Sequence, residues 1–405
     1  MAYPTNTNNR IFYATQAVAV GDRNASGVID SWSPGSAVIS GTGNVMIAHG
    51  VQSIGVTTNF NLEQIFELGQ LSLYENYEEI PEIEVSFEKV LDGYSLLYHC
   101  GTVSATDPTL PGRGTARADV RMAVGFDTNS YMAVGGNSGV AELYCSGMYI
   151  SSVSYNLGTD GNFTESTTFV GNNKLWITGT ETTGNLLTND NGVLDSVFTT
   201  GIFKEDAPVG VGNSVLRRQN VVIGSGGKTF GSTTLKTEVP NIVASTGTAG
   251  SLTNTYLIDE ESGPYLQSVS ISCDLGREAI QQLGRKAPYF RYVNFPVDVT
   301  CDIEITATEG DNVDAYEEGY PSAANGVAVG KNLKDHSIQI VLDDSTVFQL
   351  GKKNKLTNVS YGGGDAGGGN ATVTYSFTNS NDFVVLHSGD PASINASGYF
   401  KNWFA

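Results

Sequence analysis

The sequence is poor in charged residues, and poorest in positive ones. Only 16% of its 405 residues are charged, and 42 Asp and Glu against 22 Lys and Arg leave a net charge of −20. A protein that wraps nucleic acid needs many Lys and Arg at the phosphates, so the composition argues against that function. The same negative charge suits a surface past which nucleic acid must slide without sticking.

Cysteine and histidine are scarce, with four of each. No C-x-x-C spacing occurs, and we expect reduced thiols in the core rather than disulfides or metal ligands at Cys100, Cys145, Cys273 and Cys301. The histidines are isolated from one another and from carboxylates at ligand spacing, so no zinc site is predicted. They are His49, His99, His336 and His387.

Long apolar runs are missing as well. No segment approaches the roughly 18 apolar residues of a membrane span. The N-terminus lacks a basic region followed by an apolar run, so no secretory signal is predicted. We expect a soluble protein made in a cytoplasm.

Catalytic motifs are absent too. There is no G-x-S-x-G elbow. Gly227, Lys228 and Thr229 resemble the end of a phosphate-binding loop, but Val222 stands where that loop requires glycine. With no converging acid, base or nucleophile, we expect neither an enzyme nor a cofactor.

What the sequence does contain is an internal repeat. Residues 51–88 read VQSIGVTTNFNLEQIFELGQLSLYENYEEIPEIEVSFE, and residues 266–304 read LQSVSISCDLGREAIQQLGRKAPYFRYVNFPVDVTCDIE. Identical residues recur 215 positions apart, as at positions 52 and 267. The residues of the first copy that recur in this way are Gln52, Ser53, Glu63, Ile65, Leu68, Gly69, Tyr74, Tyr77 and Pro81. Such a repeat predicts two copies of one domain.

Each copy predicts a strand, a short helix and a second strand. Residues 52–57 alternate as a strand does. Asn59 or Asp274 would cap a helix, and Gly69 or Gly284 would end it in a left-handed conformation. The strand after Pro81 or Pro296 alternates apolar with polar residues, which predicts an acidic exposed face at Glu82, Glu84, Glu88, Asp298, Asp302 and Glu304.

A second match extends the repeat. Residues 150–155 resemble residues 356–361, and NFTESTTF resembles NATVTYSF, so each copy is expected to finish with a long hairpin. Abundant Gly, Ser, Thr and Asn indicate a mainly β protein, and the repeat predicts that it holds two tandem copies of one domain, each with a short α-helix. The predicted domains are residues 1–198, with an N-terminal arm, and residues 199–405, with a linker and a C-terminal tail.

Other segments carry weaker expectations. Strands are predicted near residues 118–124, 140–144 and 149–155, and a loop at residues 107–114. Residues 89–100 could form a hairpin turn at Asp92 or a helix that Asp92 caps, and the helix is favoured. Residues 179–251 show little pattern and are interpreted as a linker plus the arm of the second copy. The aromatic tail with Tyr399, Phe400, Trp403 and Phe404 is expected to dock on its own domain or on a partner.

These motifs resemble one family. HGVQSIGVTTNFNLEQIFELGQLSLYEN, VSFEKVLDG and LGRKAPYFRYVNFPVDVTCDIE look like the tail tube proteins of long-tailed bacteriophages, over most of residues 45–176 and 214–385. The resemblance implies two tandem β-sandwich or barrel domains in the chain, each with a short flanking α-helix. It further implies six such domains per ring, rings stacked into a tube, and a channel through which double-stranded DNA passes without specific binding. It also implies a place in the virion tail, assembly in the host cytoplasm, and contacts with tape measure, terminator, baseplate or tip proteins and a possible sheath.

A duplicated chain of this kind implies a trimer, although a hexamer of the whole chain stays open. The acidic strand faces are candidates to line the channel, or else are ordinary solvated faces. Acidic Glu75, Glu78 and Glu79 of the first copy and basic Arg285, Lys286 and Arg291 of the second are candidates to pair across domain or subunit interfaces. The alternative functions are another ring- or shell-forming virion component (connector, baseplate or capsid protein) and a β-rich adhesion protein.

Overall fold

The computed structural model of the chain is mainly β, in several antiparallel sheets. It describes residues 11, 16–22, 45–69, 71–102, 105, 107–124, 141–178, 187–188, 194–195, 215–224, 226–230, 233–243, 255–258, 264–308, 310–311, 313, 335–344, 346–364 and 369–387. The predicted N-terminal arm and C-terminal aromatic tail lie outside these residues. The mainly β class is confirmed.

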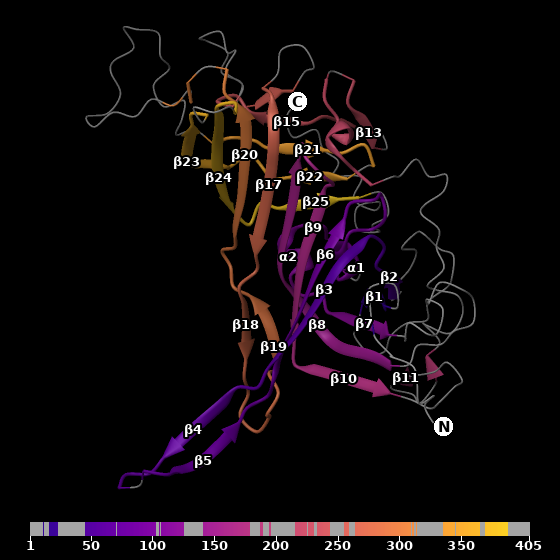
Figure 1. The fold of residues 1–405 in the computed structure, drawn as a ribbon, viewed down its shortest axis with the longest axis vertical. Coiled ribbons are helices and arrows are strands. Elements are labelled where there is room, and N and C mark those ends of the chain that lie inside the picture. Colours follow the sequence, from indigo (N-terminus) through magenta and orange to yellow (C-terminus); the bar gives the residue numbers. More distant parts are fainter. Residues whose placement is uncertain are drawn as a thin grey trace.

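Eight strands form one continuous sheet across the molecule (Figure 1). Their order is β3 (Val51–Asn59), β6 (Glu82–Val90), β9 (Thr164–Gly171), β8 (Ala141–Gly158), β17 (Leu266–Asp274), β20 (Asp298–Thr306), β24 (Thr372–Ser380) and β23 (Lys355–Gly362). The first four strands come from the N-terminal half of the chain and the last four from the C-terminal half. β8 and β17 join the two groups in the middle of the sheet.

The first strand pair of each group has the same register. Ser53 lies opposite Glu88 in β3–β6, and Ser268 lies opposite Glu304 in β17–β20. In both pairs the register shifts just before that serine, at a β-bulge. The residue at the bulge is Gln in both, and its side-chain amide donates to the carbonyl oxygen two residues earlier.

The second strand pair of each group also has the same register. The β8–β9 register shifts between Ile150 and Ser152, and the β23–β24 register shifts between Leu356 and Asn358. The hairpins that were predicted from residues 150–155 and 356–361 are therefore confirmed. The strands that were predicted after Pro81 and Pro296 are confirmed as β6 and β20, with alternate residues buried.

A second layer branches from the first part of β8, which extends beyond the main sheet. There β8 pairs with β7 (Ala118–Val124) on one side and β10 (Asn173–Thr178) on the other. β7 pairs with β1 (Gln16–Asp22), and β1 pairs with β2 (Val45–Ile47). The sequence predicted two strands where β8 is one, because Gly147 (φ 64°) lets the strand bend at a register shift without ending.

A five-stranded sheet lies against the apolar face of the main sheet, and its strands cross the main strands (Figure 1). Its order is β16 (Thr255–Leu257), β15 (Glu238–Pro240), β21 (Gln339–Val341), β22 (Val347–Gln349) and β25 (Val384–Leu386). The ring of Phe348 in β22 lies 4.7 Å from that of Tyr155 in β8. Buried side chains of both halves of the chain form one continuous cluster.

The helix that was favoured in residues 89–100 exists, but it is one turn, α1 (Leu97–Cys100), and Asp92 does not cap it. Asp92 instead accepts from Lys89 Nζ at 2.6 Å. The first amides of α1 donate to the buried Glu165 carboxylate of β9, from Leu97 N at 2.8 Å and Tyr98 N at 2.9 Å. A cap from a distant strand has no local sequence signal.

The predicted helix after Asn59 and after Asp274 is wrong. These segments are the hairpins β4–β5 (Leu62–Phe66, Leu73–Glu78) and β18–β19 (Arg277–Ile280, Phe290–Val293). The helical spacing of Phe60, Ile65 and Leu68 misled because these side chains are exposed and bury no common face. Gly69 (φ 93°) and Gly284 (φ 83°) are left-handed as expected, but at hairpin tips.

Part of the predicted linker is also wrong. Leu216, Val239, Ile242 and Val243 are buried in the core, and β15 belongs to the five-stranded sheet. The predicted loop at residues 107–114 includes one helical turn, α2 (Leu110–Arg113). The remaining short elements are η3 (Arg218–Asn220) and the pairs β11–β12 (Leu187–Thr188, Leu194–Asp195) and β13–β14 (Lys228–Phe230, Thr233–Leu235).

Candidate assembly interfaces and channel face

The junction between β8 and β17 is a closed antiparallel seam. Ile271 lies opposite Tyr155, and Cys273 lies opposite Val153. All four side chains are buried. The two halves of the chain therefore join through continuous backbone hydrogen bonds with apolar side chains packed beneath them.

The outer strands of the sheet, β3 and β23, carry the residues that match this seam. Val56 and Thr58 of β3 stand where Ile271 and Cys273 stand in β17, and Val359 and Tyr361 of β23 stand where Val153 and Tyr155 stand in β8. In the described residues, β3 pairs only with β6, and β23 only with β24.

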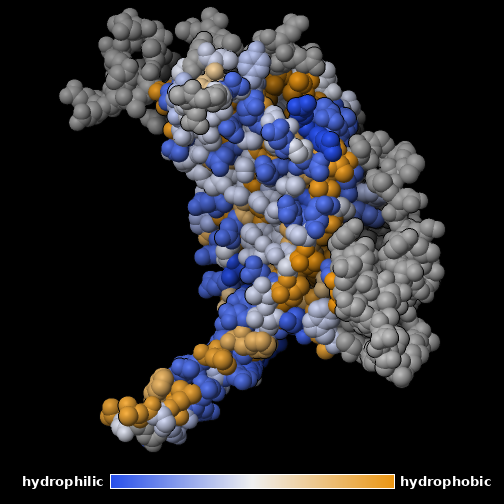
Figure 2. Space-filling model, in the orientation of Figure 1, coloured by the Kyte–Doolittle hydropathy of each residue, from blue (hydrophilic) through white to orange (hydrophobic). Residues whose placement is uncertain are grey.

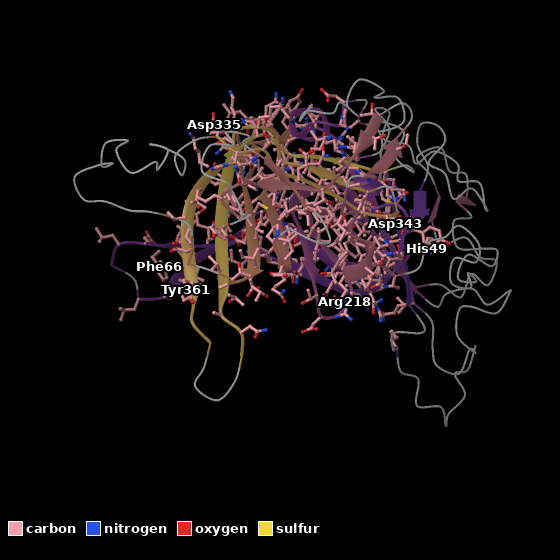
Figure 3. The ribbon with its side chains drawn as sticks, turned by 90° about the horizontal axis from the view of Figure 1, so that it is seen from above. His49, Phe66, Arg218, Asp335, Asp343 and Tyr361 are labelled. Carbon is pink, nitrogen blue, oxygen red and sulfur yellow. The ribbon has the colours of Figure 1, made fainter. Side chains whose placement is uncertain are left out.

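The matching side chains differ in burial. Tyr155 is 1% exposed, whereas Tyr361 is 53% exposed. Val56 and Val359 are half-buried, whereas Ile271 and Val153 are buried. Figure 3 places Tyr361 and His49, which lies just before β3, toward opposite sides of the molecule. Among the described strands, β3 and β23 thus form the two ends of the main sheet, and each end is partly apolar.

The predicted channel-lining carboxylates all lie on one face of the main sheet, opposite the core. Glu84, Glu88, Asp298 and Asp302 are exposed, and Glu82 and Glu304 are half-buried. The outward positions of β6, β9, β17, β20, β24 and residues 151–158 of β8 hold Ser, Thr, Asn, Gly, Val, Asp and Glu, and no Lys or Arg. This face is negative and rich in hydroxyl groups.

Cross-strand hydrogen bonds order this acidic face. Ser268 Oγ donates to Glu304 Oε2 at 3.0 Å, and the hydroxyls of Ser272 and Thr300 are 2.6 Å apart. Ser380 Oγ lies 3.4 Å from Asp298 Oδ1, a long contact at the lower end of the sheet. Short hydroxyl side chains keep the surface smooth and hold the carboxylates near the sheet.

The β18–β19 hairpin docks on the N-terminal half at the end of this face. Arg277 Nε donates to Ile150 O at 2.7 Å, and Arg277 Nη1 donates to Gly114 O. The guanidinium lies over the Tyr149 ring, 5.3 Å from its centroid, and the Phe290 ring lies 5.2 Å from Tyr149. Burial lowers the pKa of Arg277 from 12.5 to about 10, which leaves it cationic at neutral pH.

A second arginine ties the same hairpin to β6. Arg291 Nη1 lies 2.8 Å from Glu82 Oε1, and its Nε and Nη2 donate to Asn172 Oδ1 at 3.3 and 3.2 Å. Arg291 is 6% exposed. Of the predicted channel and contact residues, Glu82 and Arg291 are therefore brought together within one chain.

The β4–β5 hairpin, by contrast, projects from the body (Figure 1). Every residue of both strands is exposed, and so are the apolar side chains Phe60, Leu68 and Leu71 beside and between them. Figure 2 shows apolar colour at the tip of this arm. Such a surface is typical of a segment that is covered by another chain.

The predicted acidic and basic contact segments share one cleft of about 290 Å³ between the two hairpins. Glu79 lines it from one side, and Arg285, Lys286 and Arg291 line it from the other. Glu75 and Glu78 lie on the exposed β5 strand and do not line this cleft.

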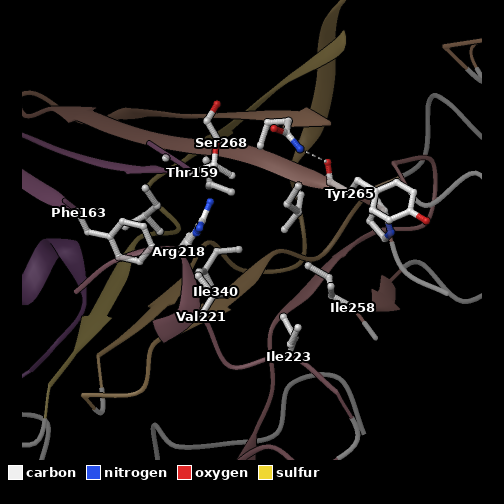
Figure 4. A pocket seen from close by; sticks show the side chains of 15 residues that line it. Thr159, Phe163, Arg218, Val221, Ile223, Ile258, Tyr265, Ser268 and Ile340 are labelled. Carbon is white, nitrogen blue, oxygen red and sulfur yellow. Dashed lines mark hydrogen bonds between the residues drawn. The ribbon is translucent and has the colours of Figure 1, made fainter. Parts of the chain in front are cut away.

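A pocket of about 240 Å³ lies at the other end of the β8–β17 seam (Figure 4). Its walls are mainly apolar, including Phe163, Val221, Ile258 and Ile340, and Arg218 contributes a charged side chain. Among the residues that the structure describes, no carboxylate, histidine or cysteine lines it. It is a packing gap where the end of the seam meets the five-stranded sheet.

Sequence reasoning missed Arg277 and Tyr149, which dock the second hairpin. Arg277 stands at the position that Leu62 holds in the first copy. This change from an apolar to a charged residue was the signal in the sequence that could have identified Arg277. The four cysteines were expected to be core thiols, and all four are buried and form no disulfide. Burial raises the pKa of Cys145 and of Cys273 to about 12.

In the part of the chain that the structure describes, no cluster of His, Cys, Asp and Glu could hold a metal ion. None of its helices has the length and hydropathy to span a membrane.

Comparisons with known proteins give little. No protein-family model matches the chain, and no curated protein matches it. Among solved structures, the chain is similar to a chain of the 6-fold symmetrised baseplate of the anti-feeding prophage, with a TM-score of 0.28 and 12% identity. The match covers 44% of this chain and 98% of the other. The likeness is weak.

Proposed function

We propose that this protein is the major tube subunit of a bacteriophage tail, a structural rather than a catalytic protein. In this proposal the chain holds two tandem copies of one unit, residues 1–198 and 199–405. Chains join edge to edge into a ring, and rings stack into a hollow tube for the genome. Other tail proteins bind at the ends of the tube.

One observation carries the proposal: the open edges β3 and β23 match, residue for residue, the strands that close the β8–β17 seam. A head-to-tail contact that repeats by rotation generates a ring when the rotation closes. Closure also removes both exposed edges, which otherwise invite aggregation. Three chains would then supply six units, and the sequence resemblance to tail tube proteins points to the same number.

The acidic face supports the channel. In a ring of such sheets the other face of the main sheet is covered by the five-stranded sheet, which leaves the acidic face free to line the lumen. Carboxylates repel DNA phosphates, so a moving duplex would meet no deep electrostatic trap. We assign the lumen to Glu82, Glu84, Glu88, Asp298, Asp302 and Glu304.

Electron microscopy of the purified full-length chain over a range of concentrations tests the assembly. We expect rings with pseudo-sixfold end views that stack into cylinders of uniform bore. Single rings that never stack would instead favour a connector or baseplate protein. Closed shells, or monomers at every concentration, would contradict the proposal.

Charge reversal tests the lumen. In assembled tubes, Glu84→Lys with Asp302→Lys should create retention of double-stranded DNA that falls steeply with salt, because phosphate contacts release counterions. Wild-type tubes should retain none. Equal retention by the two would remove the lumen assignment.

A further inference from the structure

We propose that the base of the β4–β5 hairpin docks on the C-terminal unit of a neighbouring copy of this chain, where Leu62 meets Leu356 and Glu75 pairs with Lys355. This rests on the proposed function, in which β3 of one copy pairs with β23 of the next. It adds a defined register and an ion pair to that contact.

The contact that already exists inside the chain is the template. After β17, the backbone continues along β8, and Leu275 N donates to Ser151 O at 2.8 Å. The base of the β18–β19 hairpin then sits beside the middle of β8, where Arg277 Nε donates to the backbone carbonyl of Ile150 and the Phe290 ring packs on Tyr149. The hairpin base is thus placed by the pairing of the strand that precedes it.

The two hairpins share their internal register, so residues can be transferred one by one. Leu62 lies opposite Glu78 as Arg277 lies opposite Val293, and Ile65 lies opposite Glu75 as Ile280 lies opposite Phe290. On the receiving strand, the shared bulge of β8 and β23 makes Lys355 the match of Tyr149 and Leu356 the match of Ile150.

The chemistry of both partners changes together at these positions. Where the internal contact packs the Phe290 ring on Tyr149, the external contact would set the Glu75 carboxylate against the Lys355 ammonium group. Where Arg277 hydrogen-bonds at Ile150, Leu62 would pack on Leu356, whose side chain is half-buried. Leu62 itself is 59% exposed in the single chain.

The charges around both sites favour this pairing. Glu78 and Glu79 lie near Glu75 in the hairpin, and Lys352 and Lys353 lie near Lys355. In the single chain, Lys355 Nζ lies 2.7 Å from Asp335, but both side chains are about half exposed, and such surface pairs add little stability. Asp382 interacts with Lys353. In the docked contact, Lys355 would bridge Asp335 and an incoming Glu75.

The two contacts have opposite polarity, which has a consequence for assembly. The internal hairpin is basic and sits near Glu82, whereas the external hairpin is acidic and would sit on a lysine cluster. Exchanging the hairpins would place Arg277 and Arg291 near Lys355. The repulsion between these like charges would disfavour the exchanged arrangement and so favour the correct contact.

The test uses the full chain with Glu75→Lys, Lys355→Glu and the double variant. Sedimentation velocity would measure chain–chain association, and thermal unfolding of the monomer would check folding. Each single variant should weaken association about tenfold, and the charge-swapped double variant should restore most of it. Glu63→Lys is the matched control, because its counterpart Glu278 stays exposed in the docked hairpin.

The outcomes separate this proposal from the proposed function. If wild type and all variants associate equally, the ion pair is wrong and the ring proposal stands. The same holds if the losses of association free energy in the two single variants simply add in the double variant. A wild-type chain that does not associate at all would overturn both.

Discussion

The closed β8–β17 seam and the open edges β3 and β23 are built from matching residues but lie in different surroundings. In the seam, Ile271 and Tyr155 are almost fully buried; at the edges, Val56 is half-buried and Tyr361 is half exposed. Apolar side chains at an exposed strand edge are a liability that isolated proteins avoid. Under the proposed function, this difference means that β8 and β17 form a contact within one chain, and that β3 and β23 form the matching contact between chains.

The largest expected effect comes from placing a charge in the β8–β17 seam and, separately, at the matching position of the β3 edge. Ile271→Lys should cost about 4 kcal/mol of unfolding free energy or prevent folding, because it buries an unpaired charge in the seam. The matching Val56→Lys should fold, since lysine can reach solvent at the edge, and should abolish association. Thermal unfolding and sedimentation velocity measure the two effects.

Thr57→Lys is the control for that pair, because Thr57 is exposed on the acidic face rather than at the core side of the edge. It should leave both folding and association near wild type. Unchanged association of Val56→Lys would show that β3 is not a joint.

A second comparison sets the two units against each other at one buried position. Glu165, which lies opposite Tyr155, corresponds to Val373, which lies opposite Tyr361. Glu165→Val removes the acceptor of two α1 amides and of the Tyr155 hydroxyl (3.1 Å), so we expect a loss of about 3 kcal/mol in chemical denaturation. The exposed Glu84→Val should change stability by less than about 0.5 kcal/mol. Equal effects would contradict the capping role.

The smallest expected effect is a pH dependence of the unfolding free energy that comes from the Glu165 carboxyl group. Burial raises the pKa of Glu165 above 4.5, although the amides of Tyr98 and Leu97 and the charge of Lys89 oppose the shift. The folded state then holds this proton more tightly than the unfolded state. Its contribution to stability is present below pH 4.5 and is lost as the pH rises through the folded pKa.

Denaturation of wild type and Glu165→Gln between pH 4 and 8 isolates this contribution. The stability of wild type relative to Glu165→Gln should fall as the pH rises above about 4.5. A constant difference would show that Glu165 is not the group responsible.

The strands were predictable from the sequence where one face packs on the core. β6 and β20 alternate because Val85 and Cys301 are buried while Glu84 and Asp302 face solvent. The hairpins β4–β5 and β18–β19 were not predictable in this way, because their apolar residues pack on no core of their own. The apolar residues of these hairpins therefore gave a misleading helical spacing.

The candidate channel face was predictable as an acidic strand face, and its residues do share one side of the sheet. The candidate assembly edges were not predictable, because the local sequence does not show that Tyr155 is buried and Tyr361 exposed. They follow only from the strand order β3–β6–β9–β8–β17–β20–β24–β23. In this order the last strand of the first group, β8, pairs with the first strand of the second group, β17. Long-range pairing of this kind has no signature within a single strand.

Disulfide cross-linking between the two edges tests the central claim most directly. Thr58 and Val359 match Cys273 and Val153, which face each other in the seam, and the native cysteines are buried. Oxidation of Thr58→Cys with Val359→Cys should yield covalent dimers and trimers with no larger closed species, because opposed residues bring their Cβ atoms within reach of a disulfide. Thr58→Cys with Tyr361→Cys, two residues out of register, should react far less. Absence of cross-linking in the first variant, or equal cross-linking in both, would contradict the pairing of β3 with β23.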